Sequence, residues 1–370
     1  MTEEERPAPA RDSAHMRRAL SLARKGWGRT APNPMVGAVV VRDGVVAGEG
    51  YHREFGGPHA EVHALRAAGE RARGATVYVS LEPCNHHGNT GPCSEALLAA
   101  GVARVVCAMR DPNPAAGGGV DRLRAAGVEV AVGVEEEAAR ELNAAFAHRF
   151  TSERPFVTLK LALSIDAALA DAARAPAWIT NERSRREVHR LRAGHDAVAV
   201  GIGTALADDP RLTVRGVRAP RVAPRRVVFD RHARLPLNSA LVRTARQVPV
   251  TVVAERPDRR RVTLLEAAGV EVLAGESLDG ALRALRGDGI TSMLVEGGAT
   301  LGAALLAAGS VDRLVIFQAP VLLGEGALHA FAGLPAAAAK QAERLRVVAR
   351  RTFDDDLMTV YAFPPTHGWR

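Results

Sequence analysis

One histidine and two cysteines in the first third of the chain constrain its fold more than any other sequence feature. His59 lies two residues before Glu61 in the run Pro-His-Ala-Glu, Cys84 ends the run Leu-Glu-Pro-Cys, and Cys93 follows after a glycine-containing loop. One imidazole and two thiolates supply three of the four ligands of a tetrahedral zinc ion, which leaves one position for water. The fold must therefore bring the helix that opens near Glu61 next to the loop that carries both cysteines.

The pattern around these residues predicts an α/β domain. Short β-branched runs alternate with segments of helical periodicity. We expect helices over residues 13–25, 59–68, 94–100 and 120–126, and strands over residues 36–41, 45–50, 76–81, 104–108 and 128–132. These elements together predict a mixed sheet that is covered by helices, a three-layer α/β sandwich.

A polar connector, Thr-Ser-Glu-Arg-Pro at residues 151–155, ends this first series. A chain of 370 residues is too long for one ordinary core. A second α/β series follows, with strands expected over residues 156–162, 197–200, 226–229, 248–253, 293–295 and 313–317. We therefore predict a disordered leader over residues 1–12, a first domain over residues 13–152 and a second domain over residues 153–370.

Composition narrows the compartment and the partners. The net charge of +8 attracts polyanions, but nearly all the positive charge is arginine spread along the chain, which favours small phosphorylated substrates over nucleic acid. No apolar run has the length of a membrane helix, and the N-terminus lacks the pattern of a signal peptide. The three cysteines form no disulfide framework. These features predict a cytoplasmic protein without a nucleic-acid or membrane partner.

Glu61 indicates whether the predicted zinc site is catalytic or structural. When bound, zinc lowers the pKa of its water toward neutrality, and a carboxylate beside that water can carry protons. A closed structural site is the alternative, and its fourth ligand would be His63, His86 or His87. Because Glu61 has no role in a closed site, we predict an open catalytic zinc. Zinc nucleobase deaminases share this His-x-Glu and Pro-Cys arrangement.

The spacing of the two cysteines argues against a nucleic-acid deaminase, which usually has a Cys-x-x-Cys pair. Here the run at residues 82–93, Glu-Pro-Cys-Asn-His-His-Gly-Asn-Thr-Gly-Pro-Cys, closely resembles the deaminase half of the bifunctional deaminase-reductases of riboflavin biosynthesis. The runs Pro-Asn-Pro-Met-Val-Gly-Ala at residues 32–38, Gly-Glu-Gly-Tyr-His at residues 48–52 and Asp-Pro-Asn-Pro at residues 111–114 resemble the same family in the same order.

This resemblance implies a cytidine-deaminase-like domain whose substrate is a diaminohydroxypyrimidine with a ribosylamino-phosphate. It also implies that Asn33, His52 and His86 hold the ribose phosphate or the ring; otherwise Asn33 is a turn residue and His52 a strand-end residue. Two departures remove positive charge, since Asn89 replaces a basic residue and residues 115–119 lack another. We expect that the deamination chemistry is intact and that the substrate phosphate is bound more weakly.

The second domain resembles the reductase half of the same family. The similar runs are Lys-Leu-Ala-Leu-Ser-Ile-Asp at residues 160–166, Trp-Ile-Thr at 178–180, Val-Gly-Ile-Gly-Thr-Ala-Leu-Ala-Asp-Asp-Pro-Arg-Leu-Thr-Val-Arg at 200–215, and Leu-Val-Glu-Gly-Gly-Ala-Thr-Leu at 294–301. The resemblance implies a dihydrofolate-reductase-like α/β fold that uses NADPH. The double glycine between a strand and a helix suits a dinucleotide phosphate, although many packing turns look alike.

The same resemblance implies two sets of binding residues in this domain. Those that face NADPH are Ala162, Trp178, Thr204, Asp208, Gly297, Gly298, Ala299, Thr300 and Leu301. Those that face the substrate are Pro176, Arg192, Leu212, Arg215 and Glu296. Arg192 and Arg215 suit a sugar-phosphate clamp, and surface arginines are the alternative.

Ala167 stands where the family has a glycine after the aspartate. If this position has a positive φ, alanine costs about 1 kcal/mol, and we expect an altered or slow reductase.

Three functions follow from the sequence: the bifunctional enzyme, a diverged paralogue with a related pyrimidine substrate, and a nucleic-acid-editing deaminase. The cysteine spacing and the second domain disfavour the third, for which salt-sensitive RNA binding would be evidence. We also expect a homo-oligomer.

Overall fold

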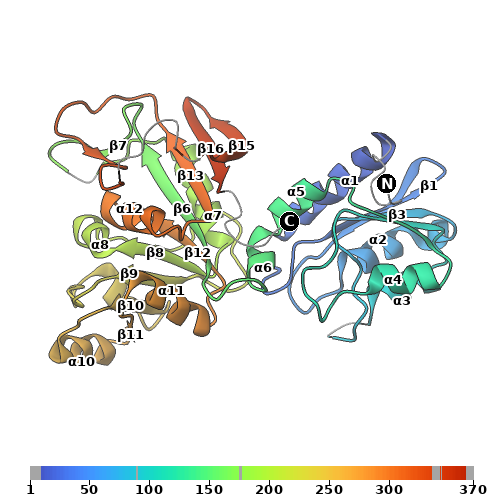
Figure 1. Cartoon of the computed structure of the whole chain (residues 1–370), viewed down its shortest axis with the longest axis horizontal. Helices are drawn as coiled ribbons and strands as arrows, with labels where there is room; N and C mark the ends of the chain where they lie inside the picture. The colour runs from blue at the N-terminus through green and yellow to red at the C-terminus, as the bar shows by residue number, and fades with distance from the viewer. Residues whose placement is uncertain (1–9, 89–90, 175–176, 336–341, 343, 364–370) are drawn as a thin grey trace. The chain divides into compact units, whose positions relative to one another are not determined.

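The computed structural model describes residues 10–363, apart from residues 89–90, 175–176, 336–341 and 343 (Figure 1). The chain divides into two compact units, residues 1–150 and 151–370. Over the described ranges, no helix combines the length and the apolar character needed to cross a membrane.

The first unit is built on a five-stranded sheet with strand order β2-β1-β3-β4-β5. Its strands are β1 Gly37–Arg42, β2 Val45–Tyr51, β3 Thr76–Val79, β4 Arg104–Cys107 and β5 Glu129–Val132. Its helices are α1 Ala10–Ala23, η2 Arg24–Gly26, α2 Ala60–Ala68, η3 Gly69–Ala72, α3 Cys93–Ala99, α4 Gly119–Ala125, α5 Glu136–Leu142 and α6 Ala144–His148. In Figure 1, α1 and α5 lie on one face of the sheet and α2, α3 and α4 on the other. The predicted three-layer sandwich is confirmed.

Helix α1 begins earlier than the sequence predicts, so residues 10–12 of the expected leader are helical. The reason is the buried side chain of Asp12, which accepts a hydrogen bond of 2.7 Å from the Tyr78 hydroxyl and two from Arg104 at 2.9 and 3.1 Å. The helix also packs closely on β1, where a Cβ at Gly37 would overlap the backbone of Ala19. These contacts fix α1 to the sheet from its first turn.

The second unit is built on a nine-stranded sheet with order β11-β10-β9-β8-β12-β6-β13-β16-β15. Its strands are β6 Phe156–Leu163, β8 Ala197–Gly201, β9 Arg225–Phe229, β10 Val250–Ala254, β11 Glu271–Ala274, β12 Ser292–Glu296, β13 Arg313–Gln318, β15 Arg346–Phe353 and β16 Asp356–Ala362, with β7 Ala168–Ala170 and β14 Leu328–His329 in a separate pair. Its helices are α7 Glu182–Ala193, α8 Ile202–Asp208, α9 Ala240–Arg243, α10 Arg259–Ala267, α11 Leu278–Gly287 and α12 Ala299–Ala307.

Seven strands of this sheet, from β11 to β13 in its order, run parallel, and only β15 and β16 pair antiparallel to their neighbours. After β11 the chain returns to place β12 between β8 and β6. The carboxyl ends of the parallel strands therefore share one edge, where open α/β sheets bind their ligands.

Ala167 has a φ of 60°, so the condition for a strained alanine at this position is met. Alanine in this left-handed region is strained, because its Cβ approaches the following carbonyl oxygen. Ala167→Gly is expected to raise the free energy of unfolding of the second unit by about 1 kcal/mol, measured as the urea midpoint of backbone hydrogen exchange in strand β6 of that unit. The control is Ala170→Gly in the extended strand β7, which should destabilise. An equal loss in both variants would contradict this assignment of strain.

Candidate active sites

The three predicted zinc ligands lie together in the first unit. Their ligand atoms lie within 4.8 Å of one another. Nδ1 of His59 is 3.5 Å from Sγ of Cys84 and 3.3 Å from Sγ of Cys93. Ordinary zinc bond lengths and tetrahedral angles place a nitrogen and a sulfur ligand about 3.6 Å apart. These residues therefore fit a zinc ion, and no fourth His, Cys, Asp or Glu of the described residues joins the group.

Three different elements position these ligands. His59 is the N-cap of α2, Cys93 is the first residue of α3, and Cys84 lies in the loop after β3. The loop is tied to α3, because the backbone N–H of Ser94 donates to the Cys84 carbonyl at 3.2 Å. Hydrogen bonds from Cys93 and His59 lower the pKa of the Cys84 thiol, despite burial, which favours the thiolate that zinc needs.

Glu61 lies in the first turn of α2 and is 3% exposed. Its Oε2 atom is buried and has no hydrogen-bond partner within the described part of the chain. Burial raises its pKa to about 7. A carboxylate that titrates near neutral pH can both accept and return a proton, so the unpartnered oxygen suits a water molecule that reacts at the metal.

Asn33 and His52 extend from the metal group as a second layer. The rings of His52 and His59 meet edge to face at 5.2 Å. The Asn33 amide Nδ2 lies 3.2 Å from Nε2 of His52, and Nδ1 of His52 lies 3.1 Å from the Pro58 carbonyl. Since an amide nitrogen donates and a carbonyl accepts, the hydrogen of His52 is on Nδ1. Burial lowers its pKa, so it stays neutral.

His86 is exposed and lies two residues after Cys84 in the same loop. Asn89, the first predicted departure from the family pattern, lies outside the described residues.

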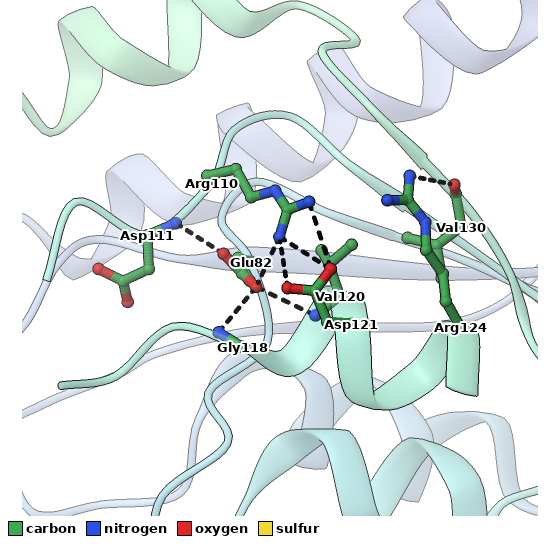
Figure 2. A network of polar contacts seen from close by, with 8 residues as sticks. All are labelled: Glu82, Arg110, Asp111, Gly118, Val120, Asp121, Arg124 and Val130. Carbon is green, nitrogen blue, oxygen red and sulfur yellow. Dashed lines mark hydrogen bonds and ion pairs between the residues drawn. The ribbon is translucent and has the colours of Figure 1, made fainter. Parts of the chain in front are cut away.

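Glu82 holds a second loop, residues 110–119, against the loop that carries Cys84 (Figure 2). Its buried carboxylate accepts backbone hydrogen bonds from Asp111, Gly118 and Val120 at 3.1, 3.1 and 3.0 Å. The Arg110 guanidinium lies 3.6 Å away. The sequence reasoning missed this role, although Glu82 is part of the recognised motif.

Close backbone packing reinforces this contact. A Cβ at Gly119 would overlap the carbonyl oxygen of Pro83. The Asn85 N–H also donates to the Ala116 carbonyl at 3.2 Å. Gly119 therefore has a structural reason, which is separate from the basic residue that the family has in this stretch.

Burial raises the pKa of Asp111 to about 6 from 3.8. Because the pKa of Asp111 is raised in the folded state, its contribution to the free energy of unfolding is fully present below 3.8, the pKa in the unfolded chain. This contribution is lost as pH rises through about 6. Asp111→Asn keeps the 2.8 Å bond that Oδ1 accepts from the Asn113 N–H. The variant should gain about 1–2 kcal/mol over wild type near pH 8 and nothing near pH 4. The measurement is the urea midpoint of backbone hydrogen exchange in strand β4 at each pH, and an equal gain at both would contradict the shifted pKa.

A cavity of about 1420 Å³ lies at the carboxyl edge of the parallel strands in the second unit. It gathers every described residue that the sequence assigns to the reductase site: Ala162, Trp178, Arg192, Thr204, Asp208, Leu212, Arg215, Glu296, Gly297, Gly298, Ala299, Thr300 and Leu301. Pro176 lies outside the described residues. Residues from four separate runs of sequence, together with Arg192, therefore line one space.

The middle of this cavity fits a dinucleotide phosphate. Gly298 is the N-cap of α12 and Gly201 is the N-cap of α8, and neither helix has a side-chain cap. A Cβ at Gly298 would lie 3.0 Å from Oγ1 of Thr204, so a side chain would fill this cradle. The backbone N–H groups at the two helix starts are oriented to bind an anion.

One end of the cavity holds a group of charged side chains. Arg192 donates two hydrogen bonds to Glu296, at 2.5 and 2.9 Å, and one to the Thr213 carbonyl at 2.9 Å. Burial would raise the pKa of Glu296, but Arg192 and Lys160 lower it, so the carboxylate is charged. Arg192 is therefore paired with another predicted substrate residue and is not a free surface arginine.

Sequence reasoning missed two residues beside this pair. Lys160 is the neighbour of Glu296 across β6 and β12, and burial lowers its pKa. His189 lies one turn before Arg192 on α7, and burial also lowers its pKa. Both residues line the cavity. The only available signal was their periodicity, since Lys160 lies two residues before Ala162 and His189 three before Arg192.

Two family models match the chain. Residues 9–109 match the cytidine and deoxycytidylate deaminase zinc-binding region, and residues 155–359 match the RibD C-terminal domain. The riboflavin biosynthesis protein RibD of Aquifex aeolicus is 46% identical over 318 residues, which cover 85% of this chain and 88% of that protein. The chain belongs to the RibD family.

Solved RibD structures have the same fold. RibD of Acinetobacter baumannii superposes with a TM-score of 0.82 at 39% identity, covering 96% of this chain and 99% of that one. A deaminase/reductase of the family from Thermotoga maritima gives 0.82 at 36% identity with the same coverage. These matches confirm the predicted family, the fold class, the bifunctional enzyme class and the use of zinc and NADPH. A small phosphorylated pyrimidine as substrate is consistent with membership of this family.

Proposed function

We propose that the chain catalyses two successive steps of riboflavin biosynthesis. Residues 13–152 deaminate a diaminopyrimidinone that carries a phosphoribosylamino group, and residues 153–370 reduce the ribosyl chain of the product to ribityl with NADPH. The observation that carries this proposal is that one chain contains both sites. The first unit has a three-ligand metal group and the buried Glu61, whose Oε2 has no partner among the described residues, and the second unit has a glycine-lined cavity.

In the first site His59, Cys84 and Cys93 hold the zinc ion, which supplies a hydroxide at neutral pH when it is bound. Glu61 takes the proton from the attacking water and returns it to the departing ammonia. The raised pKa of this buried carboxyl, about 7, suits both transfers. Asn33, neutral His52 and exposed His86 bind the ring or the ribose phosphate. In support, His52 packs against the ligand His59, Asn33 contacts His52, and none of the three belongs to the metal-ligand group.

In the second site the starts of α8 and α12 bind the diphosphate of NADPH, with Thr204, Asp208 and Gly297–Leu301 around it. Ala162 and Trp178 face the nicotinamide end, and NADPH supplies the hydride. Arg192, Arg215, Leu212, Glu296 and Pro176 bind the substrate. The Arg192–Glu296 pair fixes both side chains at the end of the cavity that also contains Lys160.

The test is a coupled assay on zinc-loaded full-length protein, which follows ammonia release and NADPH oxidation separately. We expect ammonia without NADPH, and NADPH oxidation only after deamination. Ammonia release without any NADPH oxidation would restrict the function to the first domain. The absence of both signals from metal-loaded protein would refute the proposal and favour a diverged paralogue. A homo-oligomer and a cytoplasmic location stay predictions.

A further inference from the structure

We propose that Arg231 recognises the phosphate on the adenosine ribose of NADPH, the group that NADH lacks, and so determines the cofactor preference. This inference rests on the proposed reductase function. It concerns the part of the cavity beyond the residues that the sequence assigns to NADPH. That part is lined by Arg231, His232, Arg234 and Glu255.

The sheet places Arg231 where the adenosine ribose would lie. Ala162 lies on β6 and the Gly298 turn follows β12, while Arg231 follows β9 and Glu255 follows β10. The order β6-β12-β8-β9-β10 separates the two ends of this edge by four strand spacings, about 19 Å. An extended dinucleotide with its nicotinamide near Ala162 and its diphosphate at Gly298 therefore places its adenosine ribose near β9 and β10.

The charges at this end fit a ribose phosphate. Nε of Arg231 lies 2.6 Å from Oε2 of Glu255, and the Arg231 side chain is 66% exposed. In proteins of a different fold, the Rossmann fold, a carboxylate binds the ribose hydroxyl of NAD and an arginine binds the extra phosphate of NADP, so these two residue types suit the two cofactors chemically. This chain has both residues. A phosphate with two negative charges attracts the guanidinium more strongly than the single carboxylate does, so Arg231 leaves Glu255 when NADPH binds.

Arg231 is better placed than the neighbouring charged groups Asp230 and Arg234 to bind the ribose phosphate. The carboxylate of Asp230 is fully buried and accepts a hydrogen bond of 2.8 Å from the Leu235 N–H. Arg234 lies 3.4 Å from the same carboxylate. Asp230 and Arg234 therefore serve the turn after β9, and Arg231 is the cation whose partner, Glu255, also lines the cavity.

Isothermal titration of the zinc-loaded full chain with NADP⁺ and with NAD⁺ tests this inference without catalysis. Arg231→Ala should raise the Kd for NADP⁺ by about tenfold, the loss of one charge-assisted contact, and leave the Kd for NAD⁺ within about twofold. Glu255→Gln should tighten NADP⁺ binding, because it removes the competing carboxylate. The matched control is Arg260→Ala, an exposed arginine outside the cavity, which should change neither Kd.

Two results would overturn the inference. The first is that Arg231→Ala binds both cofactors as wild type does. The second is that Arg231→Ala weakens the binding of both cofactors equally, which would show only a contribution to the fold. Failure of the wild-type protein to bind NADP⁺ at all would instead refute the proposed reductase function, so the two failures are distinguishable.

Discussion

Glu61→Gln is expected to lower the rate of ammonia release by about 10³-fold, within the range that a general acid–base group contributes. Glutamine has the same shape, and Glu61 is not one of the three clustered metal-ligand residues. The zinc content should therefore stay at the wild-type level. The loss arises because an amide cannot take the proton from the attacking water or return it to the leaving ammonia.

The second domain provides an internal control for this variant. Glu61→Gln should oxidise NADPH at the wild-type rate when it is given the deaminated substrate. Substrate binding should change little, so the loss should appear in kcat and not in KM. A variant that retains zinc and releases ammonia at more than about a tenth of the wild-type rate would contradict the role of Glu61.

Glu82→Ala is expected to cost the first unit about 3–5 kcal/mol of unfolding free energy, the range found when one partner of a buried charged network is removed. The carboxylate is 4% exposed and accepts three backbone hydrogen bonds. Without it the N–H groups of Asp111, Gly118 and Val120 lose their acceptor, and each unsatisfied buried donor costs about 1–3 kcal/mol. Figure 2 shows that these donors come from both ends of the loop.

The urea midpoint of zinc release reports on this unit alone, because the zinc ligands all belong to it. Asp121→Ala is the matched control, since Asp121 also pairs with Arg110, at 3.3 Å, but its side chain is 68% exposed. An exposed ion pair contributes at most about 1 kcal/mol, so this variant should keep its midpoint. Equal effects of the two substitutions on the midpoint would contradict the role of Glu82 in holding the loop of residues 110–119.

The zinc group was predictable because its residue types and short spacings carry the chemistry. His59 and Glu61 share one turn of helix, and the cysteines flank one loop. The reductase cavity was predictable only through runs that resemble a family, since its residues come from the ends of several strands. For Ala167 the family's glycine indicated that a positive φ was an option, because glycine adopts it without strain, and the structure established it.

The contacts of Glu82 could not be predicted, because its three donors lie 29 to 38 residues further along the chain. The sequence shows that Glu82 precedes Pro83 but not which loop packs on it. Lys160 was missed for a similar reason, since it lies on a strand whose neighbour β12 follows over 100 residues later. Residues 346–353 were not predicted as a strand, because β15 is a mostly exposed edge strand without polar alternation.

The most direct test of the two-step account is isotope labelling of the product in one reaction. Wild-type protein would convert the diaminopyrimidinone substrate in heavy-oxygen water with NADPH deuterated at its hydride position. The account predicts one product molecule with heavy oxygen on the pyrimidine ring and deuterium on the first carbon of the ribityl chain. Deuterium in a product that keeps both amino groups would contradict it, because reduction would then precede deamination.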